Sequence, residues 1–303
     1  MAVAGDCIQR RSGRFRALIL GAGAALLTVL ATAGCGSASS AGQDPGKAIQ
    51  RAAYVSSSAA GYKVAIHMQE GVSSLNGNIT GVGTGSFNLP KHAGRMTLDL
   101  TLPGSLSSAG TLAVQEILFG GRIYVKLPAK IATGLPGHKP WLEIDLAQIG
   151  KAAGIQNLTS LFGGSGSTNP GQFLQYLRAA SSGGVKRLAG ATVDGVQTTE
   201  YRAKLDLLKA PAAAPSSQRA ALRQAVSSLE KLTGLRTIPV DVWVDSQHLV
   251  RRITMAYSVN SSGQSVHTQM RLDFLSYGSQ PVPAPPPSSQ VTNASSMLSK
   301  TSG

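Results

Sequence analysis

Apolar and polar residues alternate strictly along several short stretches of the chain. In the clearest, Met96, Leu98, Leu100 and Leu102 are separated by Thr97, Asp99 and Thr101. Alternation with a period of two gives a strand one apolar and one polar face. Similar stretches predict strands at residues 63–69, 122–127, 141–146, 185–193, 196–207, 238–244, 249–259 and 267–275. We therefore expect one long antiparallel sheet with one wet face and one apolar face.

A period of three to four residues predicts helices between these strands. The strongest spans residues 216–232, where Leu222, Val226 and Leu229 share a face and Gly234 follows the end. Further helices are expected at residues 45–58, 146–153 and 170–181. The glycine-rich stretch 79–87 predicts a bent or bulged strand, and residues 163–167 predict a loop. The pattern as a whole indicates an α+β domain with helices inserted into a sheet.

The N-terminal segment has the form of an export signal. Four arginines lie within residues 1–16, and an uncharged run extends from Ala17 to Gly34. The run ends in Leu-Ala-Thr-Ala-Gly-Cys35, which resembles the bacterial lipobox, although Thr32 stands where that pattern prefers an aliphatic residue. The resemblance implies cleavage after residue 34, diacylation of Cys35 and a flexible tether over residues 35–44. The protein would then lie at the outer face of the cell membrane.

Two other interpretations of this segment stay open. Ala31-Thr32-Ala33 is also an A-x-A cleavage site, which would release a soluble secreted protein. The uncharged run is 18 residues long, so an uncleaved membrane anchor is possible by length.

Composition narrows the range of partners. The two cysteines, Cys7 and Cys35, both lie in the N-terminal segment, so the body of the chain has no internal disulfide and no thiolate metal site. Residues 1–34 hold four Arg and one Asp; their removal leaves 24 basic and 13 acidic residues and a formal charge of +11. Such a surface suits phospholipid head groups or anionic envelope polymers. Nucleic acid is not an expected partner, because the chain has no basic helix stripe and no aromatics interleaved with arginine.

No catalytic chemistry is predicted. The five histidines lack metal-ligand spacing, and no cofactor or metal is expected. Asp194 and Asp245 precede turns, where aspartate caps the backbone. Asp145 stands before a helix as a natural N-cap, and Glu143 on the same strand face is expected to be solvated.

The order of several short motifs resembles the LppX/LprG-type lipoproteins of actinobacteria. The matching pieces are Trp141–Asp145 before a helix, Val193-Asp-Gly195 with Thr199-Glu-Tyr201, Ile238–Asp245 with Leu249–Arg252, and Tyr277-Gly with Pro281–Pro285. The resemblance implies a LolA/LolB-like half-barrel over residues 45–280, in which helices close an apolar cavity. Residues 281–303 are expected to form a Pro-rich, disordered tail.

The same resemblance implies binding of acyl chains and carriage of a lipid or lipoglycan, with a membrane transporter as a further candidate partner. The alternative is an envelope sensor or scaffold with a packed core. The apolar positions of the alternating strands and of one helix are candidates to line the cavity, although each is equally compatible with ordinary core. They are Leu98, Leu100, Ile123, Val125, Leu142, Ile144, Phe173, Leu177, Val240, Val242, Ile253, Met255, Leu272 and Phe274.

Overall fold

The computed structural model describes residues 44–74, 77–104, 110–120, 122–134, 136–152, 157, 174, 176–179, 184–214, 216–261 and 264–294. All of these belong to one compact unit of the chain. The predictions for the export signal, Cys35, the 163–167 loop and Phe173 lie outside the described residues.

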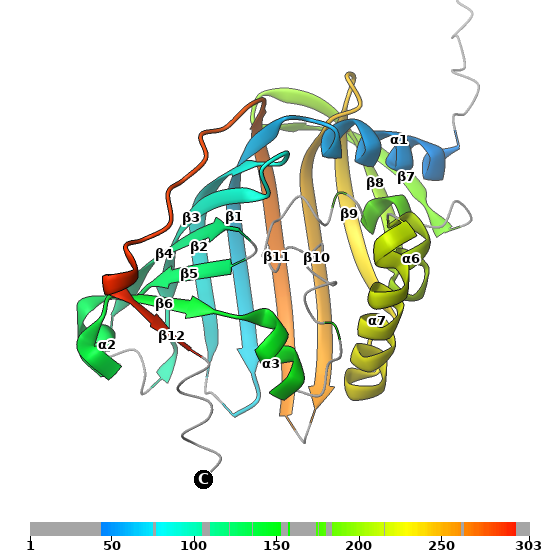
Figure 1. The fold of residues 1–303 in the computed structure, drawn as a ribbon. Coiled ribbons are helices and arrows are strands. Elements are labelled where there is room, and N and C mark those ends of the chain that lie inside the picture. Colours follow the sequence, from blue (N-terminus) through cyan, green and yellow to red (C-terminus); the bar gives the residue numbers. More distant parts are fainter. Residues whose placement is uncertain are drawn as a thin grey trace, which may run out of the picture. The chain divides into compact units, whose positions relative to one another are not determined.

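One mostly antiparallel sheet of 12 strands dominates the described part of the chain. Its order is β12-β6-β5-β4-β3-β2-β1-β11-β10-β9-β8-β7, and its ends do not meet (Figure 1). The strands are β1 (Gly61–Val72), β2 (Asn78–Asn88), β3 (Ala93–Thr101), β4 (Thr111–Phe119), β5 (Arg122–Lys126), β6 (Trp141–Ile144), β7 (Lys186–Val193), β8 (Val196–Asp206), β9 (Thr237–Asp245), β10 (Val250–Ser261), β11 (Gln264–Tyr277) and β12 (Val291–Asn293).

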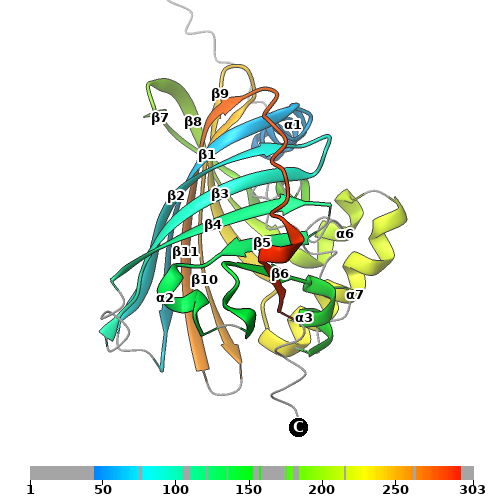
Figure 2. The same cartoon turned by 60° about the vertical axis from the view of Figure 1, so that its left-hand side comes forward.

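The helices gather mainly on the concave side of this sheet (Figures 1 and 2). The α-helices are α1 (Pro45–Ser57), α2 (Ala129–Ala132), α3 (Leu146–Ala152), α6 (Ala210–Ala213) and α7 (Arg219–Thr233). Short 3-10 turns are η2 (Pro136–His138), η3 (Leu177–Ala179), η5 (Leu207–Lys209), η6 (Ser216–Gln218) and η7 (Ser288–Gln290). The predicted α+β fold, a curved antiparallel sheet with helices over an apolar inner face, is confirmed. Within the described residues, no helix has the length and apolar character needed to cross a membrane.

Local signals explain where the two long helices begin and end. The Asp44 side chain accepts a hydrogen bond from the Gly46 N–H at 2.8 Å, and Pro45 fits the first helical position of α1. Helix α7 ends at Gly234, whose φ of 71° lies in the left-handed region that glycine adopts without strain. Both helices agree with the sequence prediction to within a few residues.

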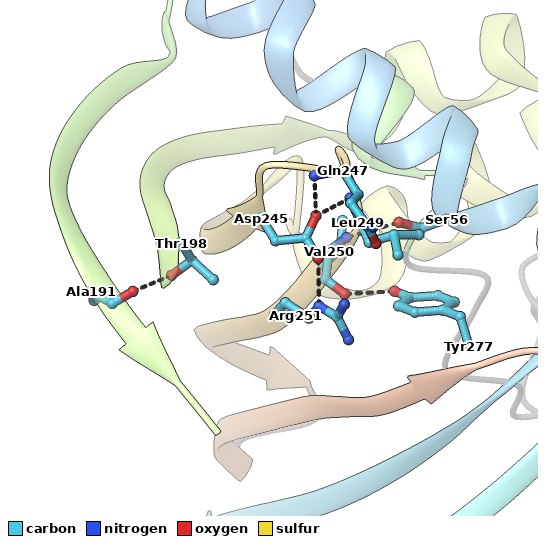
Figure 3. Close-up of polar contacts among 9 residues, drawn as sticks. All are labelled: Ser56, Ala191, Thr198, Asp245, Gln247, Leu249, Val250, Arg251 and Tyr277. Atoms are coloured by element: carbon cyan, nitrogen blue, oxygen red, sulfur yellow. Dashed lines mark hydrogen bonds and ion pairs between the residues drawn. The ribbon is translucent and has the colours of Figure 1, made fainter. Parts of the chain in front are cut away.

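A buried polar network ties α1 to the β9–β10 turn (Figure 3). The Asp245 carboxylate accepts hydrogen bonds from the N–H groups of Gln247 (2.9 Å) and Leu249 (2.8 Å), and from Arg251 Nε (2.7 Å). The Val250 N–H then donates to Ser56 Oγ of α1 at 2.9 Å. The turn-capping role predicted for Asp245 is therefore confirmed, and its carboxylate also neutralises a half-buried arginine.

Residues 79–87 were expected to form a bent or bulged strand, and the strand β2 that they form has no bulge. Strand β2 pairs without a register shift with β1 and with β3, and the shift in this region instead lies at Lys63/Val64 of β1, opposite β11. The glycines of β2 allow close approach: a Cβ on Gly83 would lie 2.0 Å from the Thr97 carbonyl oxygen.

Two strands differ from the sequence prediction. Strand β4 was not predicted, because its alternation breaks at Glu116-Ile117-Leu118. The predicted disordered tail begins at Pro281, yet residues 291–293 form β12 and pair in parallel with the edge strand β6. Lys139 Nζ donates to the Val291 carbonyl at 3.0 Å and helps to hold this short strand against the sheet.

Candidate functional site

The strand register places the predicted cavity residues on one face of the sheet, here called the inner face. Leu98 pairs with Val114, and Val125 pairs with Leu142, so each set of partners points to the same side. On the other side of β1, Ile253 pairs with both Leu272 and Val242. The thirteen candidates within the described residues all lie on this face or, for Leu177, in the core packed against it.

The inner face is divided into two parts with different burial. The first, here called the packed half, comprises β8–β11 covered by α1 and α7. Its candidates Val240, Val242, Ile253, Met255, Leu272 and Phe274 are at most 4% exposed. Ile49 of α1 and Val226 of α7 complete the same core cluster. These side chains offer very little accessible surface to a ligand.

The second part, here called the open half, is the inner face of β2–β6. Seven of its aliphatic side chains are half-buried: Leu98, Leu100, Leu112, Val114, Val125, Leu142 and Ile144. Phe87, Met96 and Leu118 lie on the same face and are buried. Ile123, at 3% exposed, is the one predicted residue of this half that is fully buried. The half-buried Glu116 lies on the same face, between Met96 of β3 and Val125 of β5. A half-buried, mainly apolar surface is suited to the apolar part of a ligand.

A stripe of glycines adjoins these aliphatic residues. Gly81, Gly83 and Gly85 occupy the inner-face positions of β2, and Gly81 and Gly83 pair with Leu100 and Leu98 of β3. No side chain projects from three successive inward positions of this strand. The leucines of β3 therefore face less side-chain packing on this flank than a strand with alternating valine or isoleucine would provide.

Polar groups mark one end of the inner face. Glu70, Thr268 and Tyr257 form one row across β1, β11 and β10, because Thr268 pairs with both other residues. Burial raises the pKa of Tyr257, and the Glu70 carboxylate adds to the rise while a hydrogen bond with Thr268 opposes it. The row gives this end of the inner face hydrogen-bonding groups, as expected of a site for an amphipathic ligand.

The sequence prediction missed two residues of the open half, Leu112 and Val114. Both lie on β4, where they alternate with the exposed Thr111, Ala113 and Gln115. This alternation was a usable signal, but it is short and ends before the strand does.

The acidic residues considered as candidates for chemistry have structural partners. Asp145 caps α3 by accepting hydrogen bonds from the Ala147 N–H at 2.8 Å and the Gln148 N–H at 3.2 Å, as predicted. Glu143 lies 3.6 Å from Arg122 in an ion pair. Among the described residues, no group of three His, Cys, Asp or Glu side chains is arranged to hold a metal ion.

No family model and no curated protein matches the chain. It is similar in structure to the lipoprotein LppX of Mycobacterium tuberculosis, with 15% identity, a TM-score of 0.42, and 80% of this chain and 98% of that chain covered. It is also similar to LprF from Mycobacterium bovis, with 12% identity, a TM-score of 0.40, and 80% of this chain and 97% of that chain covered. A third similar structure is a LolA-superfamily protein from Nitrosomonas europaea, with 8% identity, a TM-score of 0.27, and 78% of this chain and 94% of that chain covered. These are the groups to which the sequence resemblance pointed. All three TM-scores lie below 0.5.

Proposed function

We propose that this protein is an exported lipoprotein, anchored through a diacylated Cys35, that holds the acyl chains of a lipid or lipoglycan on its open half. It would carry that lipid across or within the cell envelope. The observation that carries the proposal is the set of half-buried aliphatic side chains on β3–β6 beside the glycine stripe of β2. The packed half keeps the domain folded whether or not the ligand is bound.

The energetics of acyl binding favour such a surface. Each buried methylene contributes about 0.8 kcal/mol, so ten methylenes contribute about 8 kcal/mol before the cost of ordering the chain. The ligand's polar head would lie toward Glu70, Thr268 and Tyr257. No catalytic residue or energy source within the protein is required for binding.

The anchor and the charge fit the same function. Two acyl chains on Cys35 would supply the two-signal anchoring that a single chain cannot. Residues 35–44 would act as a flexible tether that keeps the domain near the membrane from which it loads. Anionic envelope polymers and a membrane transporter are the protein's further proposed partners.

A second candidate function is a sensor or scaffold that carries no lipid. The observation that favours it is the packed half, in which Val242 and Ile253 are fully buried. In that case the open half would contact another protein instead of acyl chains.

A matched pair of variants on β4 tests the acyl site. Val114→Asp places a charge on the inner face, whereas Ala113→Asp places the same charge on the exposed outer face of the same strand. We expect Val114→Asp to weaken uptake of a fluorescent fatty acid by the full chain at least tenfold, because an unpaired carboxylate opposes an apolar ligand. Ala113→Asp should bind like the unsubstituted protein.

Native mass spectrometry with lipid extraction provides the second readout. A co-purifying lipid that is lost in Val114→Asp and retained in Ala113→Asp would support the carrier. Equal uptake by both variants, or no lipid and no uptake in the unsubstituted protein, would contradict it and favour the scaffold.

The anchor is tested separately through Cys35. Cys35→Ala should move the protein from the membrane fraction to the soluble fraction, because acylation needs the thiol. Continued partitioning with membranes would show that the N-terminal segment, not a lipid, holds the protein there.

A further inference from the structure

The C-terminal segment crosses the face of the sheet opposite to the inner face, here called the outer face. Residues 278–290, here called the C-terminal strap, run from the end of β11 toward β6 (Figure 2). The Asn88 side-chain amide donates to the Gln280 carbonyl at 2.7 Å and holds the start of the strap. Pairing of β12 with β6 holds its other end. A segment tied at both ends forms a fixed bridge over the strands between them.

A hollow of about 720 Å³ lies between the strap and the sheet. Pro283 and Ala284 of the strap line one side of it, and outer-face residues of β1–β4 line the other. Trp141 also lines the hollow and is only 8% exposed, although its position on β6 is on the outer face. The volume is in the range of ordinary small-molecule sites.

The floor of this hollow carries two cations beside hydroxyl and amide groups. Lys63, Ser86 and Arg95 lie side by side on β1, β2 and β3, so the two cations start about 10 Å apart on the backbone. Thr84 and Thr97 form the next row of the floor. Both Lys63 and Arg95 are exposed, and within the described part of the chain neither has an ion-pair partner.

Cations predominate around the hollow. Lys126 lies 5.9 Å from the ring centroid of Trp141 and adds a third cation beside the hollow. Glu116 is the acidic residue among the described lining residues, and its place in the alternation of β4 is on the inner face. The exposed floor therefore presents cations and neutral hydrogen-bonding groups without a carboxylate between them. Two cations that flank hydroxyl groups can hold a phosphate while the hydroxyls bond to a sugar or polyol.

We propose that the hollow under the C-terminal strap binds a phosphorylated polyol, either as a free molecule or as the head group of a lipid. Lys63 and Arg95 would contact the phosphate, and Ser86, Thr84 and Thr97 would contact the hydroxyls. The site is on the opposite face of the sheet from the proposed acyl site. Binding in the hollow does not depend on whether the proposed acyl site binds a lipid.

Trp141 provides a direct reporter for this site. The chain has two tryptophans, so the full chain with Trp243→Phe, purified in a neutral detergent, reports on Trp141 alone. The probes are myo-inositol 1-phosphate, neutral myo-inositol, and dihexanoyl-phosphatidylinositol kept below its micelle concentration. We expect a saturable change in Trp141 fluorescence with at least one phosphorylated probe, and an at least tenfold weaker response to neutral inositol.

Paired charge variants locate the binding. In the same background, Lys63→Gln/Arg95→Gln should weaken the response at least tenfold. Lys186→Gln/Lys204→Gln removes the same charge from exposed positions on β7 and β8, at the far edge of the sheet. This control pair should change the fluorescence response less than twofold. Added salt should weaken the response, because the two cations are exposed.

The outcomes separate the sources of the ligand. A response to both phosphorylated probes would support a site for the free polyol phosphate, and a response to the lipid alone would support a head-group site. The proposal is overturned by no response to either probe, by an equal response to neutral inositol, or by a response unchanged in Lys63→Gln/Arg95→Gln. None of these results depends on fatty-acid uptake, which tests the acyl site.

Discussion

The packed half and the open half belong to one sheet and follow the same alternation, yet their inner faces differ in burial. In the packed half, Val242 and Ile253 are fully buried beneath α1 and α7. In the open half, Leu98, Leu100 and Val114 are only half-buried. The difference does not come from residue type, since both sets are aliphatic.

The difference comes from what faces each set of side chains. Two long helices supply partners for the packed half, whereas the glycine stripe of β2 supplies no side chain to the neighbouring leucines of the open half. Aromatic residues fill the junction: Tyr62 of β1 stacks on Phe87 at 5.2 Å and meets Phe274 of β11 edge-on at 5.2 Å. One sheet therefore combines a fully buried core with a half-buried, mainly apolar surface.

The largest predicted effect comes from truncating a side chain of the packed half. Ile253→Ala should lower the free energy of unfolding by about 4 kcal/mol, because a fully buried isoleucine leaves a cavity. Leu100→Ala in the open half should cost about 1 kcal/mol, because folding removes only part of this half-buried side chain from water. Urea unfolding of both variants measures the difference. Equal losses would mean that the two halves are packed alike.

The second prediction concerns the network that holds α1 on the packed half. Asp245→Ala removes three hydrogen bonds and leaves Arg251, 17% exposed, without its carboxylate. We expect a loss of about 3 kcal/mol. Asp99→Ala, an exposed carboxylate on β3, should change stability by less than about 0.5 kcal/mol. Unfolding midpoints for the pair provide the measurement, and a loss below 1 kcal/mol for Asp245→Ala would argue against a structural role for the network.

The sequence predicted the packed half better than the open half. Residues 238–244, 249–259 and 267–275 alternate over long stretches, so the strands and the face of Val242, Ile253 and Leu272 could be assigned from the period alone. Helix α7 had both its apolar stripe and its terminal glycine in the sequence. These signals are local, and local signals are what a single sequence contains.

The features that were missed depend on contacts between distant residues. Alternation placed Leu98 and Ile253 on apolar faces alike, but burial depends on whether a helix covers them. Strand β12 follows a Pro-rich segment, and its pairing with β6 brings Val291 beside Trp141, 150 positions earlier in the chain. Likewise, the glycines of residues 79–87 predicted a bent or bulged strand from residue type alone. The close approach of Gly83 to the Thr97 carbonyl is set by the neighbouring strand β3, which the local sequence does not show.

The third prediction tests that close approach in the open half. Gly83→Ala would place a Cβ 2.0 Å from the Thr97 carbonyl oxygen, so β2 and β3 would have to move apart. We expect a loss of about 2 kcal/mol, in the range for overpacking. Gly184→Ala meets no atom within 4 Å and should change stability by about 0.5 kcal/mol or less. If thermal unfolding gave the two variants the same stability, the glycine stripe would not be needed for strand packing.

The smallest effect is expected where the two halves meet, at Tyr277. Its hydroxyl donates to the Val250 carbonyl at 2.6 Å, so Tyr277→Phe should cost about 1 kcal/mol at neutral pH. Burial raises the pKa of Tyr277, as it does for Tyr176 and Tyr257. The folded state therefore keeps the phenol protonated at pH values where the unfolded chain ionises, above about 10. Stability should fall as the pH rises beyond that value.

Tyr277→Phe removes one of these three groups, so its stability should fall less steeply than that of the unsubstituted protein between pH 9.5 and about 11. Tyr54→Phe is the matched control, because the Tyr54 residue is 60% exposed and lies on α1 outside the core. Urea midpoints measured across this range distinguish the variants. An unchanged slope in Tyr277→Phe, together with no loss at neutral pH, would mean that the junction is held by the aromatic contacts of Tyr62, Phe87 and Phe274 without help from this hydroxyl.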